Sequence, residues 1–227
     1  MRAAGWLLAG PPLAWAAYTW GSYLPFGPAV WRGPARGLDV ALTFDDGPDP
    51  EHTPTVLDVL AREGIGATFF LIGARAARRP DLVREIAAAG HDLGNHTWSH
   101  RSLWLAGPRA TALEVRRGHA AIADAAGRPP RFFRAPWGLT NRALPRVLRA
   151  LGTPCVFWSV QPEGRRAVPA PLQVARVLER AHPGAIVDLH DADGVPGAGR
   201  RLVEALPVLI RRLRGRGYRM VPLRNLL

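Results

Sequence analysis

The stretch LDVALTFDDGPDPEHTPTVLDVLAREG, residues 38–64, contains a complete strand–helix unit. Its apolar run Leu38–Phe44 predicts a buried strand, because short apolar runs bounded by turn residues are typical of strands. The segment Pro54–Glu63 predicts a helix, since a Thr-Pro pair opens it and Gly64 stands where a helix ends. The same alternation continues to the end of the chain.

The remaining elements follow this strand–helix alternation. Further strands are predicted at Ala67–Ile72, His91–Asn95, Arg131–Arg134, Pro154–Val160, Ala185–His190 and Tyr218–Leu223. Further helices are predicted at Asp81–Ala89, Arg109–Ala126, Arg142–Ala150, Leu172–Ala181 and Arg200–Arg214. Alternating strands and helices form a parallel sheet, so the fold class is α/β. Seven strands fit a closed or nearly closed barrel better than an open sheet.

Composition limits the classes of function. The 227 residues suit one domain with an appendage and can bury a full α/β core. The net charge is +12 and every basic residue is an arginine. Because this charge is spread along the chain, we expect no nucleic-acid binding, and attraction to an anionic membrane or cell-wall polymer fits better. The single cysteine, Cys155, excludes an internal disulfide.

The N-terminal segment differs in composition from the rest of the chain. Between Arg2 and Arg32 no residue is charged, and tryptophans, tyrosines and leucines are frequent. We predict a signal peptide or membrane anchor at residues 1–36, followed by a catalytic domain at residues 37–227. An apolar extension packed on the domain is the alternative. The expected location is the cell envelope, with the protein secreted or membrane-anchored.

Two short patterns indicate a metal site. Asp45 and Asp46 end the first strand, and adjacent buried acids repel unless a cation or proton is shared between them. His96 and His100 are four residues apart, which on a helical turn places both imidazoles on one face. Each pattern alone is common in turns or on surfaces. Together they predict that Asp46, His96 and His100 hold a metal ion.

Polar residues stand at the ends of four predicted strands: Asp45 and Asp46, Asn95 and His96, Arg134, and His190 and Asp191. In a β/α barrel these strand ends open on one face, where active sites lie. Residues that are far apart in the sequence are therefore expected to converge there.

Four motifs carry a resemblance to a known family. They are TFDDGP at Thr43–Pro48, H-[ST]-x-x-H at His96–His100, R-x-P-x-G at Arg134–Gly138, and Leu189-His190. Over Leu38–Leu223 the chain resembles the polysaccharide deacetylase family, also called the NodB homology domain or carbohydrate esterase family 4. The resemblance implies a distorted (β/α) barrel and metal-dependent hydrolysis of an acetamide or acetyl ester on a sugar.

The resemblance also implies residue roles in the metal half of the site. Asp45 is the expected general base, and Asp46, His96 and His100 are the expected ligands of one divalent ion. Zinc is the first choice for an Asp-His-His set, and cobalt, nickel or manganese also suit these ligands.

The remaining implied roles lie in the acid half and the substrate pocket. Arg134 is expected to hold Asp45 ionised and oriented, and His190 to act as general acid. Leu189 is expected to line the pocket for the acetyl methyl group, and the backbone N–H of Trp137 to bind the oxyanion.

The fourth family motif is altered in this chain. Where the family has an aspartate after Trp-Ser-Val, this chain has Gln161, and the Asp-Trp that usually follows is missing. Two acids can compensate: Glu163 in the same loop, and Asp188, which alternation places on the same strand face as His190. We expect Asp188 to pair with His190 or with Arg134. A hydrogen bond from Asp188 to backbone or buried water is the alternative.

The expected function is removal of N-acetyl groups from an N-acetylglucosamine-containing glycan: peptidoglycan, a lipid-linked precursor or a chitin-like oligomer. The partners are then an acetylated glycan and, through the N-terminus, a membrane. An O-acetyl esterase acting on a polysaccharide is a second hypothesis. A non-catalytic glycan-binding relative is a third, and only the altered fourth motif supports it.

Overall fold

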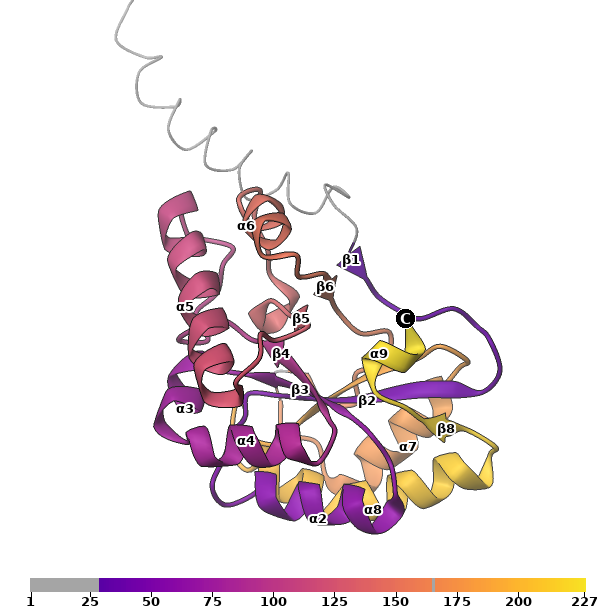
Figure 1. Ribbon diagram of the computed structural model, residues 1–227. Coiled ribbons are helices and arrows are strands. Elements are labelled where there is room, and N and C mark those ends of the chain that lie inside the picture. The colour runs from indigo at the N-terminus through magenta and orange to yellow at the C-terminus, as the bar shows by residue number, and fades with distance from the viewer. Residues whose placement is uncertain (1–28, 165) are drawn as a thin grey trace, which may run out of the picture.

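The computed structural model describes residues 29–164 and 166–227 (Figure 1). The predicted signal peptide or anchor falls mostly on residues 1–28, which lie outside the described residues. Within the described ranges, no helix combines the length and apolarity needed to cross a bilayer.

The folded domain begins before its predicted start at residue 37. Strand β1 (Ala29–Val30) pairs in parallel with β6 (Cys155–Val156). The Gly33 N–H donates to the Gly184 carbonyl over 2.8 Å. Residues 29–36 are therefore part of the domain, and the predicted boundary is too late.

Seven parallel strands curl into a half-barrel with helices around its outer face (Figure 1), which confirms the predicted α/β barrel. Their order is β1-β6-β5-β4-β3-β2-β7, and β8 pairs with the start of β2. The other strands are β2 (Asp39–Asp45), β3 (Thr68–Leu71), β4 (Asp92–Asn95), β5 (Phe132–Phe133), β7 (Ile186–His190) and β8 (Arg219–Met220).

The barrel is distorted where it closes. Of the strand predicted at Pro154–Val160, only Cys155–Val156 is regular, and Val160 forms an isolated bridge to Val187 of β7. Between these points the carbonyls of Val156 and Phe157 accept hydrogen bonds from the Arg134 side chain. A side chain therefore takes the place of a neighbouring strand, which is why the predicted strand is broken.

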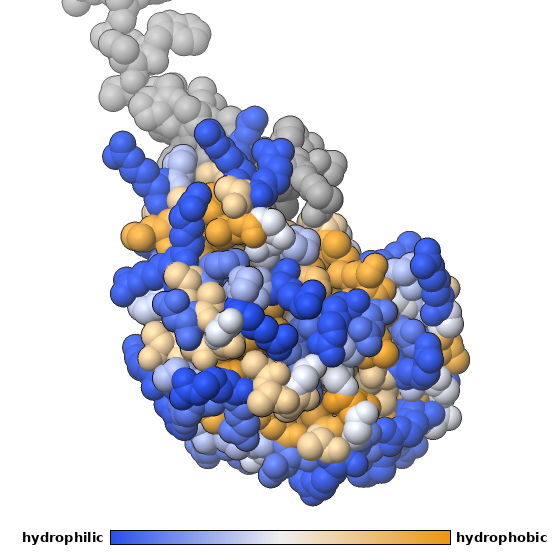
Figure 2. All heavy atoms as spheres, viewed as in Figure 1, coloured by the Kyte–Doolittle hydropathy of each residue, from blue (hydrophilic) through white to orange (hydrophobic). Residues whose placement is uncertain are grey.

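The helices of the outer layer are α2 (Thr53–Glu63), α3 (Gly73–Arg78), α4 (Pro80–Ala88), α5 (Pro108–Ala126), α6 (Leu144–Leu151), α7 (Ala170–Arg180) and α8 (Ala198–Gly215); a short α9 (Leu223–Leu226) follows β8. All six predicted helices are present. The helices α3 and α9 lie outside the predictions because six and four residues are too short to show an apolar period. Hydrophilic side chains cover much of the face seen in Figure 2, with apolar residues in patches among them.

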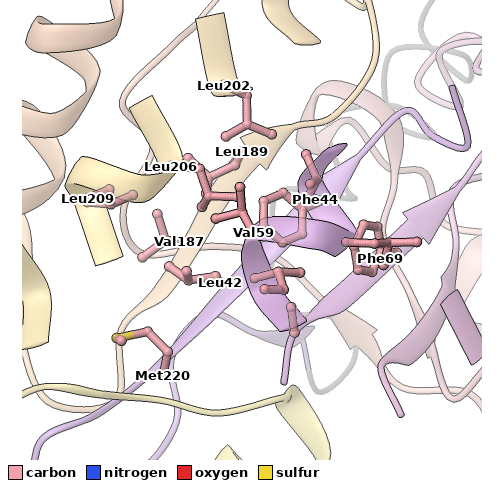
Figure 3. Close-up of a cluster of buried hydrophobic side chains, with 14 of the residues drawn as sticks. Leu42, Phe44, Val59, Phe69, Val187, Leu189, Leu202, Leu206, Leu209 and Met220 are labelled. Carbon is pink, nitrogen blue, oxygen red and sulfur yellow. The ribbon is translucent and has the colours of Figure 1, made fainter. Parts of the chain in front are cut away.

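Alternation along the strands divides the core into two layers. The outer layer lies between the sheet and the helices (Figure 3) and includes Leu42, Phe44, Phe69, Val187, Leu189, Leu202, Leu206 and Leu209. The inner layer fills the barrel and contains Ala41, Phe70, Phe132, Val156 and Ile186, together with Leu223 and Leu226 of α9. Toward the carboxyl ends of β2 and β7 the inner face becomes polar, and the candidate site lies there.

Candidate active site

The centre of the site is a buried ion pair between Asp45 and Arg134. Asp45 ends β2, and Arg134 follows β5 directly. The Arg134 Nη1 donates to Asp45 Oδ1 over 2.7 Å, and the two residues are 0 % and 3 % exposed, respectively. A guanidinium at this distance fixes the orientation of the carboxylate through a charge-assisted hydrogen bond.

Each side-chain nitrogen of Arg134 has a hydrogen-bond partner on the inner wall of the barrel. Its Nη1 also donates to Thr43 Oγ1 over 2.8 Å, while Nε and Nη2 donate to the carbonyls of Val156 and Phe157 over 3.2 and 2.9 Å. The guanidinium carbon lies 4.0 Å from the centre of the Phe70 ring. A buried arginine needs such partners, because an unpaired buried charge is strongly destabilising.

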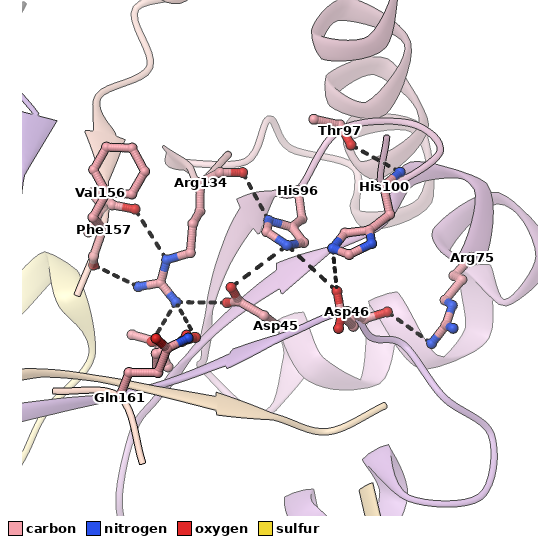
Figure 4. A network of polar contacts seen from close by, with 12 residues as sticks. Asp45, Asp46, Arg75, His96, Thr97, His100, Arg134, Val156, Phe157 and Gln161 are labelled. Carbon is pink, nitrogen blue, oxygen red and sulfur yellow. Dashed lines mark hydrogen bonds and ion pairs between the residues drawn. The ribbon is translucent and has the colours of Figure 1, made fainter. Parts of the chain in front are cut away.

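Asp46, His96 and His100 come together as predicted for a metal site (Figure 4). Asp46 Oδ1 lies 3.0 Å from His100 Nε2 and 3.6 Å from His96 Nε2. His96 Nδ1 lies 2.9 Å from the Arg134 carbonyl oxygen, which can only accept, so Nδ1 carries the proton and Nε2 offers its lone pair to the site.

The two histidines do not lie on a helical turn, and that prediction is wrong. They lie in the loop after β4, in which Thr97 and His100 have positive φ angles of 68° and 58°. Thr97 Oγ1 accepts a hydrogen bond from the His100 N–H, and Glu114 of α5 accepts hydrogen bonds from the N–H and hydroxyl of Ser99. The loop, and not helical periodicity, brings the imidazoles together.

The residues present fit a divalent cation. Asp46 Oδ1 is buried and has no hydrogen-bond partner among the described residues, yet it faces two imidazole nitrogens. Burial and the neighbouring His96 lower the pKa of His100 to about 4, so this imidazole is neutral, as a metal ligand must be. One carboxylate oxygen and two imidazole nitrogens leave coordination positions for water and substrate.

Across the site, His190 ends β7 and is paired in register with Asp45. Asp188 lies two residues earlier on the same face and is 1 % exposed. Its Oδ1 is 3.3 Å from Arg134 Nη1, and its Oδ2 accepts a hydrogen bond from Gln161 Nε2 over 2.9 Å. Of the contacts expected for Asp188, the structure therefore contains the one with Arg134.

In the acid half of the site, which is formed by His190 and Asp188, neighbouring charges and burial shift the pKa of His190 in opposite directions. Burial alone lowers the pKa of His190, but the carboxylates of Asp188, Asp46 and Asp45 raise it above its ordinary value. Burial and the neighbouring Asp45 raise the pKa of Asp188 to about 7, although His190 and Arg134 act against this rise. Because both oxygens of Asp188 face N–H donors, its hydrogen bonds are those of a carboxylate.

Two predicted site residues make their main contacts outside the Arg134 network, although Glu163 is still among the carboxylates that raise the pKa of His190. Glu163 binds Arg201 of α8, with 2.6 Å between Oε1 and Nη2, and also accepts from the Val168 N–H. Leu189 packs in the outer core with Phe44 and Leu202, on the face of β7 opposite His190 (Figure 3). Leu189 therefore does not line a pocket beside His190, and alternation along β7 is the physical reason.

Trp137 lies at the rim of the site. Its side chain is 49 % exposed and its ring centre lies 4.4 Å from that of His100. Its backbone has a positive φ of 55° within the turn Pro136–Gly138, which directly follows Arg134 and Ala135.

Two contributors were not predicted from the sequence. Thr43 supports Arg134, and its position two residues before Asp45 on the same strand face was the available signal. Arg75 of α3 donates to the Asp46 carbonyl over 3.1 Å (Figure 4), and no sequence pattern indicates this contact.

Comparison with known proteins agrees with this geometry. The family model described as polysaccharide deacetylase matches residues 32–156. A chitooligosaccharide deacetylase from Bradyrhizobium sp. (strain ANU 289) is 39% identical over 198 residues, covering 82% of this chain and 90% of that protein. A peptidoglycan-N-acetylglucosamine deacetylase from Bacillus cereus is 33% identical over 210 residues, covering 92% and 74%, respectively.

Solved structures share the fold. The crystal structure of the Bc1960 peptidoglycan N-acetylglucosamine deacetylase matches with a TM-score of 0.84 and 33% identity, covering 92% of this chain and 97% of that one. BA3943 from Bacillus anthracis, a CE4 family pseudoenzyme, matches with a TM-score of 0.80 and 23% identity, covering 88% and 68%, respectively. Because a pseudoenzyme has this fold, the fold alone does not establish activity.

Zinc titration tests the assignment of the metal site. Calorimetric titration is expected to show one zinc ion bound per chain. His100→Ala removes one of three ligands, so we expect its zinc affinity to fall at least about 100-fold. His182→Ala, which removes an imidazole outside the site, is the control and keeps the wild-type affinity. Equal zinc binding by His100→Ala and wild type contradicts the assignment.

Proposed function

The chain belongs to the polysaccharide deacetylase family of hydrolases, and we propose that it removes N-acetyl groups from an N-acetylglucosamine-containing glycan, releasing acetate. The observation that carries this proposal is the buried pair of Asp45 and Arg134 beside the group Asp46, His96 and His100. A base and a metal-ligand set on one face of the barrel are what amide hydrolysis requires.

The relatives' names support this choice of substrate. They include chitooligosaccharide deacetylases and peptidoglycan-N-acetylglucosamine deacetylases, both acting on N-acetylated glycans. A glycan of the cell envelope also suits the net charge of +12 and the apolar N-terminal segment. We therefore place the protein at the envelope, membrane-anchored or secreted.

In the proposed reaction Asp45 takes the proton of the attacking water. Its Oδ1 is held by Arg134 and its Oδ2 lies 3.8 Å from His96 Nε2, so the carboxylate faces the metal ligands. Asp46, His96 and His100 would hold a divalent ion, for which zinc is our first choice, and the bound ion would supply Lewis acidity toward the amide carbonyl and the attacking water. The backbone N–H of Trp137 donates to the developing oxyanion.

His190 completes the reaction as general acid. As the carbon–nitrogen bond breaks, it gives its proton to the departing amine nitrogen, leaving acetate and a free amino sugar. This step needs a protonated imidazole. We assign Asp188 the role of keeping His190 protonated, because Asp45 and Asp188 share the single positive charge of Arg134 and leave one negative charge in excess.

Glu163 has a weaker claim to this role. Its carboxylate is paired with Arg201, so its charge is largely compensated. Gln161 cannot carry charge, but its amide fixes Asp188 from the side opposite Arg134.

Acetate release tests the function. The full chain loaded with zinc is expected to release acetate from chitotetraose, and a chelator to abolish the release until zinc is restored. Asp45→Asn is expected to lower the rate at least about 100-fold, because the general base is lost. Release from O-acetylated xylan alone supports the esterase, and zinc-dependent glycan binding without turnover supports the non-catalytic relative. Both of these outcomes contradict the proposal.

The pH profile tests Asp188. The reaction slows as the pH rises through the pKa of His190, and Asp188→Asn lowers that pKa. We therefore expect the basic limb of the kcat profile to move to lower pH by about one unit. Hydrolysis of an aryl acetate, whose leaving group needs no proton, should change little. The control Asp58→Asn, on the exposed face of α2, keeps the wild-type profile.

An unmoved basic limb in Asp188→Asn contradicts the assignment. Equal slowing of amide and aryl ester also contradicts it, because Asp188 then acts only by supporting Arg134 and Asp45.

A further inference from the structure

A cavity of about 260 Å³ opens beside the metal half of the site. Asp46 and His100 form one side of it, and Arg75 and Arg78 of α3 form another. Asp193, in the loop after β7, completes the rim. A group that fills this cavity touches two of the residues assigned to the metal, so the cavity belongs to the space available to substrate.

The arginines of α3 bring uncompensated positive charge to this cavity. Arg75 donates to the carbonyls of Asp46 and Asp193 over 3.1 and 3.5 Å, and carbonyls carry no net charge. Among the described residues no carboxylate lies within 4.0 Å of the side-chain nitrogens of Arg75 or Arg78. Arg134 and Arg201, by contrast, are both paired with carboxylates.

Two acids, Asp46 and Asp193, stand at the rim, and neither forms an ion pair with these arginines. The N–H groups of Gly197 and Gly199 donate to the Asp193 carboxylate over 3.0 and 3.4 Å. Although burial opposes ionisation, these hydrogen bonds hold the pKa of Asp193 below its ordinary value. They also orient its carboxylate toward the backbone of its own loop. The carboxylate of Asp46 is assigned to the metal.

The loop after β7 forms the wall of the cavity beside Asp46. A Cβ atom at Gly194 would lie 2.0 Å from Asp46 Oδ2, so this position has no room for a side chain. The backbone of the loop therefore lies directly against the metal ligand. The space next to it remains free for a ligand.

We propose that this cavity binds a carboxylate carried by the glycan next to the N-acetyl group that is removed, with Arg78 and Arg75 as its recognition residues. Guanidinium groups bind carboxylates through paired, charge-assisted hydrogen bonds. The proposal rests on the proposed deacetylase function and narrows its substrate to acidic glycans, such as peptidoglycan strands whose lactyl carboxylates carry no peptide, over neutral chitooligosaccharides.

The test compares matched substrates. Acetate release is measured with the zinc-loaded full chain on a peptidoglycan-derived tetrasaccharide whose lactyl carboxylates are free, on the same tetrasaccharide with these groups amidated, and on chitotetraose. We expect kcat/KM to favour the free carboxylate over the amide by about tenfold. Arg78→Gln should bring this ratio close to one. Added salt should lower the wild-type ratio, because the cavity is open to solvent.

Arg78 is the better test residue because Arg75 also supports the backbone of Asp46. Arg211→Gln, which removes the same charge from the exposed face of α8, should keep the wild-type ratio. A wild-type ratio near one, or an unchanged ratio in Arg78→Gln, overturns the inference while deacetylation stands. Absence of acetate from all three substrates overturns the proposed function itself.

Discussion

The ion pair between Arg134 and Asp45 is the interaction on which the rest of the site depends. A guanidinium with 0 % exposure needs hydrogen-bond partners, and here the barrel wall supplies at least one to each of its nitrogens. The main chain at the end of β6 presents the carbonyls of Val156 and Phe157 to Arg134, so the distortion of the barrel and the placement of the proposed base have one cause. The Arg134 carbonyl also fixes the tautomer of His96, which links the proposed base Asp45 to the proposed metal ligands.

The two halves of the site differ in how they are held. The metal half rests on loops: Asp46 and His100 both have positive φ angles, and hydrogen bonds within and beneath the loop after β4 fix its shape. The acid half rests on the strand β7, where register aligns His190 with Asp45. Asp188 connects the halves, because it shares Arg134 with Asp45 and lies on the face of β7 that carries His190.

Much of the fold and the meeting of the metal-ligand candidates could be predicted from the sequence, because both depend on local sequence patterns. Strand–helix alternation predicts the α/β barrel, and motif spacing predicts that Asp46, His96 and His100 meet. What was missed depends on distant contacts or on side-chain direction. The two-residue strand β1 forms only because it pairs with β6, which is distant in the sequence. Likewise, the ion-pair partner of Glu163 is Arg201, 38 positions away. The error at Leu189 was avoidable, since alternation already separates it from His190. The loop that carries His100 depends on Glu114 of α5, which spacing alone does not reveal.

The central claim is that Arg134 serves catalysis through Asp45 and is not needed to hold the metal. Arg134→Met, compared with Arg134→Lys, tests it most directly through zinc titration and acetate release on the same folded samples. We predict that both variants bind one zinc ion and that their rates on chitotetraose are at least about 100-fold below that of wild type. Lysine does not replace arginine fully, because it lacks the planar guanidinium with its paired donors. A folded, zinc-loaded Arg134→Met protein with the wild-type rate would contradict the account.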